Sequence, residues 1–153
     1  MKYREDYITG DQLFIGIAEL ASKRSKDPRS RHGACIVNSN NRVVSVGWNG
    51  LADGIEDTDE IWQRGIKDNY VIHSEINAIL NATVSLVGCR LYMFSERGYY
   101  PCSAGCAQAI VQVGIKEVIL KHITEEQEAK QKYIGEYTKK MFDAVGINIR
   151  ILE

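Results

Sequence analysis

The N-terminal part of the chain carries an amphipathic pattern. Apolar residues recur at helical spacing across residues 11–23, namely Leu13, Phe14, Ile17, Ala18, Leu20 and Ala21. Asp11 precedes them and can cap the first turn. The pattern predicts a first helix over residues 11–23. A polar loop follows at Asp27-Pro28 and Gly33, because proline disfavours helical backbone in the residue before it.

Short apolar stretches then indicate a sheet. Residues 34–37 and 42–48 are β-branched segments, and residues 38–41 between them favour turns and tolerate left-handed backbone. The two segments predict an antiparallel hairpin. Residues 47–69 are rich in glycine and acidic side chains, and they predict a long irregular connection with one helical turn near residues 61–62.

The C-terminal half alternates helical and strand patterns. Helices are predicted over 71–82, 104–113 and 125–145, and strands over 90–94, 117–121 and 147–152. Helices that alternate with strands after an opening hairpin favour a sheet with both faces covered. The sequence therefore predicts an α/β fold with three layers, α/β/α, in which a mixed five-stranded sheet carries helices on both faces.

Size and charge narrow the class of protein. The 153 residues, 44% of them hydrophobic, are enough for one compact domain over residues 1–153 without disulfide support. The formal net charge of -1 draws the surface neither to nucleic acid nor to anionic membrane, so we expect no polynucleotide and no membrane partner. Residues 1–10 lack a signal-like apolar stretch, and apolar runs elsewhere fall short of the roughly 18 residues that span a bilayer. We expect a cytoplasmic protein.

Two clusters of possible metal ligands stand at the starts of predicted helices. His73 and Glu75 form the first cluster, and Cys102 and Cys106 form the second, directly after Pro101. One imidazole and two thiolates can supply three tetrahedral zinc ligands, which leaves the fourth position to water as in catalytic sites. Glu75 is too close in sequence to His73 to ligate comfortably beside it. The pattern predicts one catalytic Zn2+ ion on the histidine and both cysteines, with Glu75 as proton carrier.

The order H-x-E and then P-C-x-x-C is known as the signature of zinc nucleobase deaminases. Beyond that signature, the chain resembles the deoxycytidylate (dCMP) deaminase family from about Leu13 to Leu152. The motifs that carry the resemblance are Arg24-Ser25-Lys26-Asp27-Pro28, Gly33 through Asn38, Gly47-Trp48-Asn49-Gly50, His73 through Ile79, and Ala107 through Val118. The resemblance implies a cytidine deaminase-like fold and an enzyme that converts dCMP and water to dUMP and ammonia, which feeds thymidylate synthesis.

Residue roles follow from the same resemblance. The residues that match the zinc ligands and the proton donor are His73, Cys102, Cys106 and Glu75. Asn49 matches an asparagine that contacts the sugar, and Ser25-Lys26 lies where the phosphate-binding loop begins. Ser74, where the family has alanine, is grouped with the substrate-binding residues. The resemblance also implies a homo-oligomer, specifically a hexamer, and a small-molecule nucleotide substrate.

The cysteine spacing departs from the family pattern. Three residues separate Cys102 from Cys106, whereas the family has two. Either Gly105 takes up the extra residue in a bulged turn, because glycine adopts positive φ at little cost, or the site is altered. The loop over residues 95–100 is also longer than usual and can reshape the pocket near C5 of the ring.

A second departure concerns regulation. The family writes Gly-Tyr-Asn-Gly-x-Pro in a segment associated with the effectors dCTP and dTTP, and Mg2+ would accompany such a triphosphate. This chain has Trp48 and Ala52 there, which argues against allosteric control. Lys26, Arg29 and Arg31 form a basic run that is either a solvated loop or a phosphate site.

Several functions stay open beside dCMP deamination. The substrate can be a C5-modified dCMP. A tRNA- or RNA-directed deaminase would need a strongly basic rim, which the balanced charge opposes. A catalytically silent zinc- and nucleotide-binding partner is supported by the cysteine spacing and opposed by Glu75, since a silent zinc site needs no proton carrier. Tyr99 and Tyr100 either stack on a base or pack on a neighbouring subunit.

Overall fold

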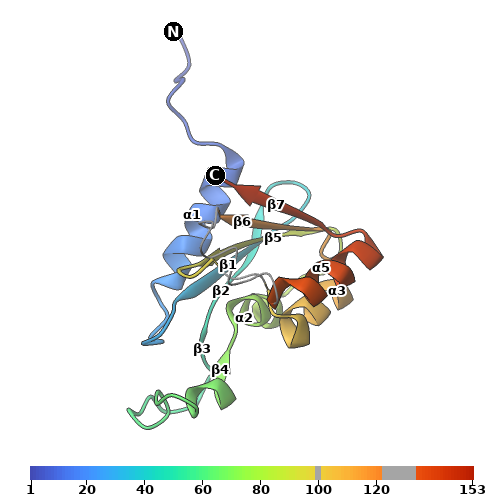
Figure 1. Cartoon of the computed structure of the whole chain (residues 1–153). Helices are drawn as coiled ribbons and strands as arrows, with labels where there is room; N and C mark the ends of the chain where they lie inside the picture. The colour runs from blue at the N-terminus through green and yellow to red at the C-terminus, as the bar shows by residue number, and fades with distance from the viewer. Residues whose placement is uncertain (99–100, 122–133) are drawn as a thin grey trace.

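A five-stranded sheet forms the centre of the molecule (Figure 1). The computed structural model of the chain describes residues 1–98, 101–121 and 134–153. The elements in chain order are α1 (Gly10–Ser22), β1 (His32–Val37), β2 (Val43–Trp48), β3 (Gly50–Leu51), η1 (Lys67–Asn69), β4 (Val71–Ile72), α2 (Ser74–Asn81), β5 (Arg90–Ser95), η2 (Ser103–Ala107), α3 (Gln108–Gln112), β6 (Glu117–Lys121), α5 (Ile134–Val145) and β7 (Asn148–Leu152).

The sheet is mixed and has the strand order β2-β1-β5-β6-β7. Strand β1 is antiparallel to both of its neighbours, while β5, β6 and β7 run parallel. Helix α1 covers one face, and α2, α3 and α5 lie on the other (Figure 1). The predicted five-stranded α/β fold with helices on both faces is confirmed.

Alternation along the strands divides the core between these two faces. In β1, Ala34 and Ile36 pack toward α2, α3 and α5, whereas Cys35 and Val37 pack toward α1. This is the period of two that a strand buried on both faces requires. On the α1 side, the rings of Phe14 and Tyr92 lie 5.3 Å apart between centroids. Each helix layer therefore has its own apolar cluster.

Two glycines bring helices unusually close to the sheet. A Cβ atom on Gly33 would lie 1.8 Å from the carbonyl oxygen of Ala18 in α1. A Cβ atom on Gly47 would lie 2.5 Å from the carbonyl oxygen of Ser74 and 2.4 Å from the backbone nitrogen of Ala78 in α2. The first turn of α2 therefore packs backbone against backbone on β2, and its position relative to the sheet is fixed.

Several element boundaries differ from the sequence predictions. The cap of α1 is Thr9, not Asp11, because the Thr9 hydroxyl accepts from the backbone of Gln12 while the Gln12 side chain accepts from the backbone of Thr9. Helix α2 begins at Ser74, since His73 keeps extended backbone as its N-cap. The two residues before His73 form β4, which pairs with β3 in a small second sheet.

The irregular connection and the C-terminal helix also differ in detail. Turns, rather than a helix, surround residues 61–62, and the regular helical turn of the connection is η1. The helix predicted over residues 104–113 consists of the distorted η2 and the short α3. Residues 125–133 of the last predicted helix, and Tyr99 and Tyr100, lie outside the described residues.

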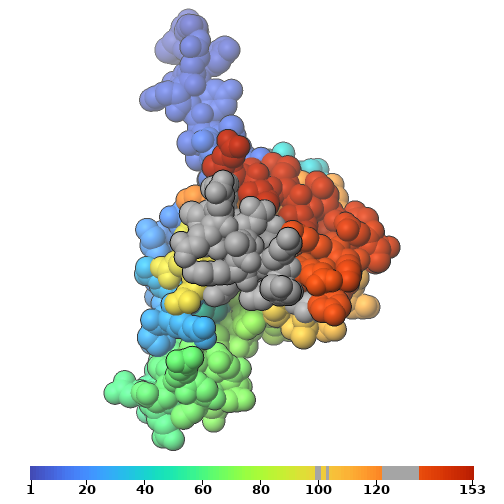
Figure 2. Space-filling model, in the orientation of Figure 1, coloured from blue at the N-terminus to red at the C-terminus, as the bar shows by residue number. Residues whose placement is uncertain are grey.

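The space-filling view shows two projections from the body of the molecule (Figure 2). The first residues of the chain extend at one end, and the green segment of the connection after β3 extends at the other. Among the described residues, no helix combines the length and the apolar character that crossing a bilayer requires.

Candidate metal centre and active site

A histidine and two cysteines meet where α2 and η2 come together: His73 and Cys102 are the N-caps of these helices, and Cys106 lies within η2. The Nδ1 atom of His73 lies 3.3 Å from Sγ of Cys106 and 3.5 Å from Sγ of Cys102. All three ligand atoms lie within 4.8 Å of one another. Tetrahedral zinc with bonds of about 2.0–2.3 Å places its ligand atoms roughly 3.3–3.8 Å apart. The donor set and its spacing therefore fit a zinc ion.

Gly105 accommodates the unusual cysteine spacing. Its φ of 102° lies in the region that favours glycine, and Ala104 before it also leaves helical geometry with ψ of 108°. The turn closes through a 2.9 Å hydrogen bond from the Ala107 backbone to the carbonyl of Cys102. The extra residue thus lies in a bulged turn, the first of the two alternatives that the sequence left open, and both thiols still reach His73.

The thiols are prepared to bind a cation. Hydrogen bonds from the Cys106 thiol and from His73 lower the pKa of Cys102 to about 4 against the opposing effect of burial. The pKa of His73 is raised, first by its hydrogen bond with Cys102. The pKa of Cys106 is raised by its interaction with Cys102 and by burial. Cys102 is therefore the more readily ionised thiol of the pair, and a bound cation would favour ionisation of Cys106 as well.

Glu75 is a buried carboxyl group beside these ligands. It is 3% exposed, and burial raises its pKa against the opposing effects of its own backbone N–H, His73 and Ser74. The fully buried Ser74 donates a hydrogen bond of 2.9 Å from Oγ to Oε2 of Glu75. Ser74 was predicted from sequence to be a substrate contact. In the structure its hydroxyl binds the carboxylate of Glu75.

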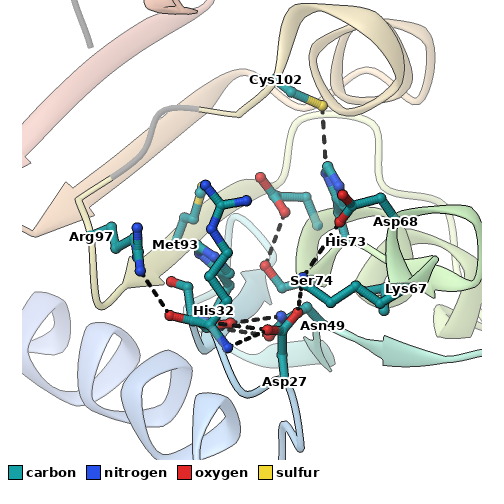
Figure 3. A pocket seen from close by; sticks show the side chains of 14 residues that line it. Asp27, His32, Asn49, Lys67, Asp68, His73, Ser74, Met93, Arg97 and Cys102 are labelled. Atoms are coloured by element: carbon teal, nitrogen blue, oxygen red, sulfur yellow. Dashed lines mark hydrogen bonds and ion pairs between the residues drawn. The ribbon is translucent and has the colours of Figure 1, made fainter. Parts of the chain in front are cut away.

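A hollow of about 320 Å³ opens beside the cluster (Figure 3). Such a volume lies at the lower end of the range for small-molecule sites. His73, Glu75 and Cys102 line it together with residues from the loop before β1, from η1 and from β5. The remaining lining residues are Asp27, Arg29, Ser30, His32, Asn49, Lys67, Asp68, Val71, Ser74, Met93 and Arg97.

Asn49 forms part of the wall and holds the loop before β1. Its Oδ1 accepts from the backbone of His32 at 2.8 Å, and its Nδ2 donates to the carbonyl of Ser30 at 3.0 Å. Burial, and secondarily the charge of His73, lower the pKa of His32 to about 4. The His32 imidazole is therefore neutral at physiological pH.

The pocket also contains charged groups from segments far apart in sequence. The ammonium group of Lys67 lies 2.6 Å from Oδ2 of Asp27, and both side chains are nearly inaccessible to solvent. Arg97 donates a hydrogen bond of 3.1 Å to the carbonyl of Arg29 (Figure 3). Arg29 and Arg97 thus stand together at the pocket, with their own acidic neighbours in the same wall.

Comparison with known families agrees with this site. Residues 8–122 match the family described as the cytidine and deoxycytidylate deaminase zinc-binding region, which spans the ligand cluster, Glu75 and the pocket wall. The chain belongs to this deaminase family. The deaminase zinc-binding region accounts for the ligand set of one histidine and two cysteines, and it supports Zn2+ as the cofactor.

Curated relatives in the deaminase family cover almost the whole chain. Deoxycytidylate deaminase of Pongo abelii is 38% identical in an alignment of 160 positions, which covers 97% of this chain and 83% of the relative. Deoxycytidylate deaminase of Homo sapiens is 36% identical in an alignment of 171 positions, which covers 97% of this chain and 93% of the relative. The fold resembles the crystal structure of dCMP deaminase from the cyanophage S-TIM5 in apo form, with a TM-score of 0.69 at 23% identity over 93% of this chain and 96% of that one.

The other substrate-binding residues predicted from the sequence of this deaminase do not all lie in the pocket. Asn49 lies in the pocket wall, whereas Lys26 forms an ion pair with Asp57 in a neighbouring hollow of about 650 Å³. Ser25 is buried, and its hydroxyl accepts from the backbone of Asp27 at 3.2 Å. The structure therefore brings neither Ser25 nor Lys26 into the wall of the deaminase pocket.

Other pocket residues of the deaminase were not singled out from sequence. Arg29 belonged to the basic run that the sequence left between a solvated loop and a phosphate site. Arg97 comes from the lengthened loop after β5, and Lys67 comes from the connection between β3 and β4 of the small second sheet. No local motif marks these two residues, because only the fold brings them to the zinc ligands.

Proposed function

We propose that this chain is a zinc-dependent hydrolytic deaminase that converts dCMP and water to dUMP and ammonia. The observation that carries the proposal is the His73, Cys102 and Cys106 cluster beside buried Glu75, in a pocket large enough for a pyrimidine ring. The names of the relatives support dCMP as substrate. The solved complex of the S-TIM5 enzyme with dCMP and dUMP shares the fold, with a TM-score of 0.67 at 21% identity.

The residues of the site support separate roles in metal binding and in proton transfer. His73, Cys102 and Cys106 would hold the zinc ion, which would make hydroxide available near neutral pH, because coordination lowers the pKa of water to about 7. Glu75 takes a proton from water and delivers it to the ring nitrogen, and it then carries the proton of the newly attached hydroxyl to the departing amine. The reaction joins the water oxygen to the ring carbon that bears the amine, and it breaks the bond between that carbon and the amine. Ammonia leaves, and the ring keeps a carbonyl group.

The 5′-phosphate is assigned to Arg29 and Arg97. Both line the hollow, and guanidinium groups recognise phosphate through charge-assisted hydrogen bonds. Lys26 is the competing candidate from sequence, but its ammonium group pairs with Asp57 outside this hollow.

Replacing Arg97 by Gln should raise KM for dCMP about tenfold and leave KM for deoxycytidine unchanged. If Lys26→Gln rather than Arg97→Gln has this effect, the phosphate binds where the sequence placed it.

The primary experiment is a steady-state assay of the zinc-loaded protein. The substrates are dCMP, CMP, deoxycytidine, dCTP and 5-substituted dCMP, with dCTP and dTTP then added as effectors. We expect turnover selective for deoxynucleoside monophosphates, and preference for a 5-substituted substrate would favour the C5-modified alternative.

Glu75→Gln should keep one zinc per chain by metal analysis and lose at least about a hundredfold in kcat. Absence of turnover in the zinc-loaded parent, or full turnover in this variant, would overturn the proposal.

A homo-oligomer is also proposed, with a hexamer as the assembly that the resemblance implies. Large apolar side chains stand exposed on the surface, among them Leu20 at 67%, Leu80 at 68% and Val87 at 76%. Such side chains support a contact between copies, since association would remove them from water. Light scattering coupled to size-exclusion chromatography distinguishes a hexamer from a monomer of 17.2 kDa.

A further inference from the structure

Four side chains, which come from the segment itself, from the end of β2 and from the loop after β5, hold the backbone of the segment that carries Arg29. Oδ1 of Asp27 accepts from the backbone of Arg29 at 2.8 Å and from the backbone of Ser30 at 3.3 Å. Oε2 of Glu96, beyond the end of β5, accepts from the backbone of Arg31 at 2.9 Å. Asn49 and Arg97 bind carbonyl and amide groups of the same segment, as described above.

Asp27 is itself fixed by a buried cation. Its Oδ2 binds the ammonium group of Lys67 at 2.6 Å, and the Asp27 side chain is only 3% exposed. The hydrogen bonds with Lys67 and with the Arg29 and Ser30 backbone lower the pKa of Asp27 against the effect of burial. Glu96 is anchored on its other oxygen, since Oε1 accepts from Nε of Arg31 at 2.8 Å. Both carboxylates are therefore ionised and held in place.

These contacts present an electrostatic contradiction. A site for a phosphate excludes nearby negative charge, because like charges repel across a few ångströms. Yet the carboxylate of Asp27 lies in the wall that presents Arg29 and Arg97, and the carboxylate of Glu96 binds the backbone of the same segment. Their hydrogen bonds point to backbone amides of residues 29–31, so their effect on the wall is geometric. A pre-organised cationic site loses less conformational entropy when the anion binds.

We propose that Asp27 and Glu96 are positioning residues for the phosphate of the substrate: they strengthen its binding by holding the Arg29 segment in place, although their charges oppose it. Lys67 acts through Asp27 in the same way. This inference rests on the proposed function for the nature of the substrate. It differs from the assignment of Arg29 and Arg97, because it concerns groups that repel the phosphate.

The sign of a binding change tests the proposal. Calorimetric titration measures Kd for dUMP and for deoxyuridine with the zinc-loaded protein, so turnover is not needed. Asp27→Asn and Glu96→Ala each remove a negative charge, which by charge alone would tighten dUMP binding. We expect both variants to weaken dUMP about tenfold and to leave deoxyuridine within twofold of the parent. Unchanged or tighter dUMP binding in both variants would overturn the proposal.

Asp68 supplies a matched control within the same pocket. Its carboxylate lies 3.4 Å from the ammonium group of Lys67, and in the described part of the chain no backbone group of residues 27–32 donates to it. Asp68→Asn therefore removes a charge without releasing the segment, and we expect dUMP binding that is equal to the parent or tighter. Weakening of dUMP by this variant to the same extent would also contradict the proposal.

A folding defect in a variant, and a failure of the proposed activity, can each be distinguished from a failure of the positioning proposal. Glu96 is on the surface, so Glu96→Ala is expected to fold even if Asp27→Asn does not. A drop in thermal stability together with equal weakening of dUMP and deoxyuridine would indicate a general structural role and count against positioning. If the parent binds dUMP more tightly than deoxyuridine but does not turn over dCMP, the proposed activity fails while the positioning test still gives its answer.

Discussion

At the scale of single residues, Gly105 decides whether the cysteine pair can serve one metal ion. A backbone with φ of 102° and ψ of -75° is accessible to glycine and strained for other residues. Nothing lies within 4 Å of the position where its Cβ would stand, so a substitution there meets no steric clash. The effect of replacing Gly105 is therefore confined to backbone conformation and to the placement of Cys102 and Cys106.

Gly105→Ala should weaken zinc retention while preserving the fold. Positive φ in alanine costs on the order of 1–3 kcal/mol, which the turn can relieve by moving one thiol away from His73. Metal competition with a chelator would measure the loss, with far-UV circular dichroism to verify the fold. Gly16→Ala is the control, because Gly16 lies in α1 with open space around its Cβ position and should gain up to about 1 kcal/mol in unfolding free energy. Equal zinc affinity in the Gly105 variant and the parent would contradict the role of this turn.

Sequence indicates candidate site residues where the chemistry is local. His73, Glu75 and the cysteines stand out because their order and types form a motif. The prediction of Asp11 as the cap of α1 was wrong. Thr9 and Gln12 have the spacing of a capping box, which is a signal for the true cap in the sequence itself. Arg97 and Lys67 had no such pattern, because their roles depend on the fold that brings them to the pocket.

At the scale of elements, the contact between α2 and β2 places the chemistry. The hydroxyl of Ser45 donates to the carbonyl of Ala78, and Nδ2 of Asn77 donates to the carbonyl of Trp48 at 2.7 Å. Together with the close approach at Gly47, these bonds fix the helix that begins with His73 as its cap. Sites built on such fixed elements hold their geometry better than sites on loops.

Gly47→Ala should displace α2 and destabilise the protein. Its Cβ would overlap backbone atoms of Ser74 and Ala78, which cannot rotate away as a side chain can. Overpacking of this kind costs roughly 1–3 kcal/mol, and we expect the upper end of that range. Urea denaturation measures the change, and zinc content should fall with it. Gly50→Ala is the matched control, because its Cβ would stand 3.6 Å from the Trp48 side chain; a similar loss in both variants would rule out the helix contact as the cause.

Elements of the large sheet were predictable because apolar runs mark them. Residues 117–121 form β6 with the predicted bounds, and residues 90–94 fall within β5. Strands β3 and β4 were missed, because each has two residues and their pairing joins segments about twenty residues apart. The start of α2 was misplaced for the same reason, since β4 occupies residues that continue the helical periodicity.

At the scale of the whole molecule, a polar network joins the first helix to the last strand. Arg150 in β7 binds both carboxylate oxygens of Asp11 in α1, and it also contacts Glu117 in β6 at 2.8 Å. The hydroxyl of Tyr92 in β5 donates to Asp11 at 2.6 Å. The hydrogen bond from Arg150 lowers the pKa of Asp11 from 3.8 to about 2 against the effect of burial. The carboxylate of Asp11 therefore links α1 directly to β5 and β7, and through Arg150 to β6.

Asp11→Asn should reduce stability in a pH-dependent manner. A depressed pKa means that the ionised group contributes stability above its unfolded value of 3.8, and that this contribution is lost as pH falls toward 2. The side chains of Asp11 and Arg150 are 30% and 36% exposed, so solvent screening limits the effect to about 1 kcal/mol at neutral pH. Urea unfolding at several pH values should show the difference between parent and variant shrinking below pH 4. A difference that is constant over this range would exclude the ionised carboxylate as its source.

The glycines at the two ends of the zinc site set different limits on how this chain can change over evolution. At Gly105 the chain has lengthened by one residue relative to its family without losing the meeting point of its ligands, because the addition lies along the chain and faces open space. At Gly47 even one methyl group is excluded, because the addition would lie across the sheet, between two backbones. New variants of this site are thus expected to arise through insertions in the cysteine turn and not through bulkier residues beneath the histidine helix.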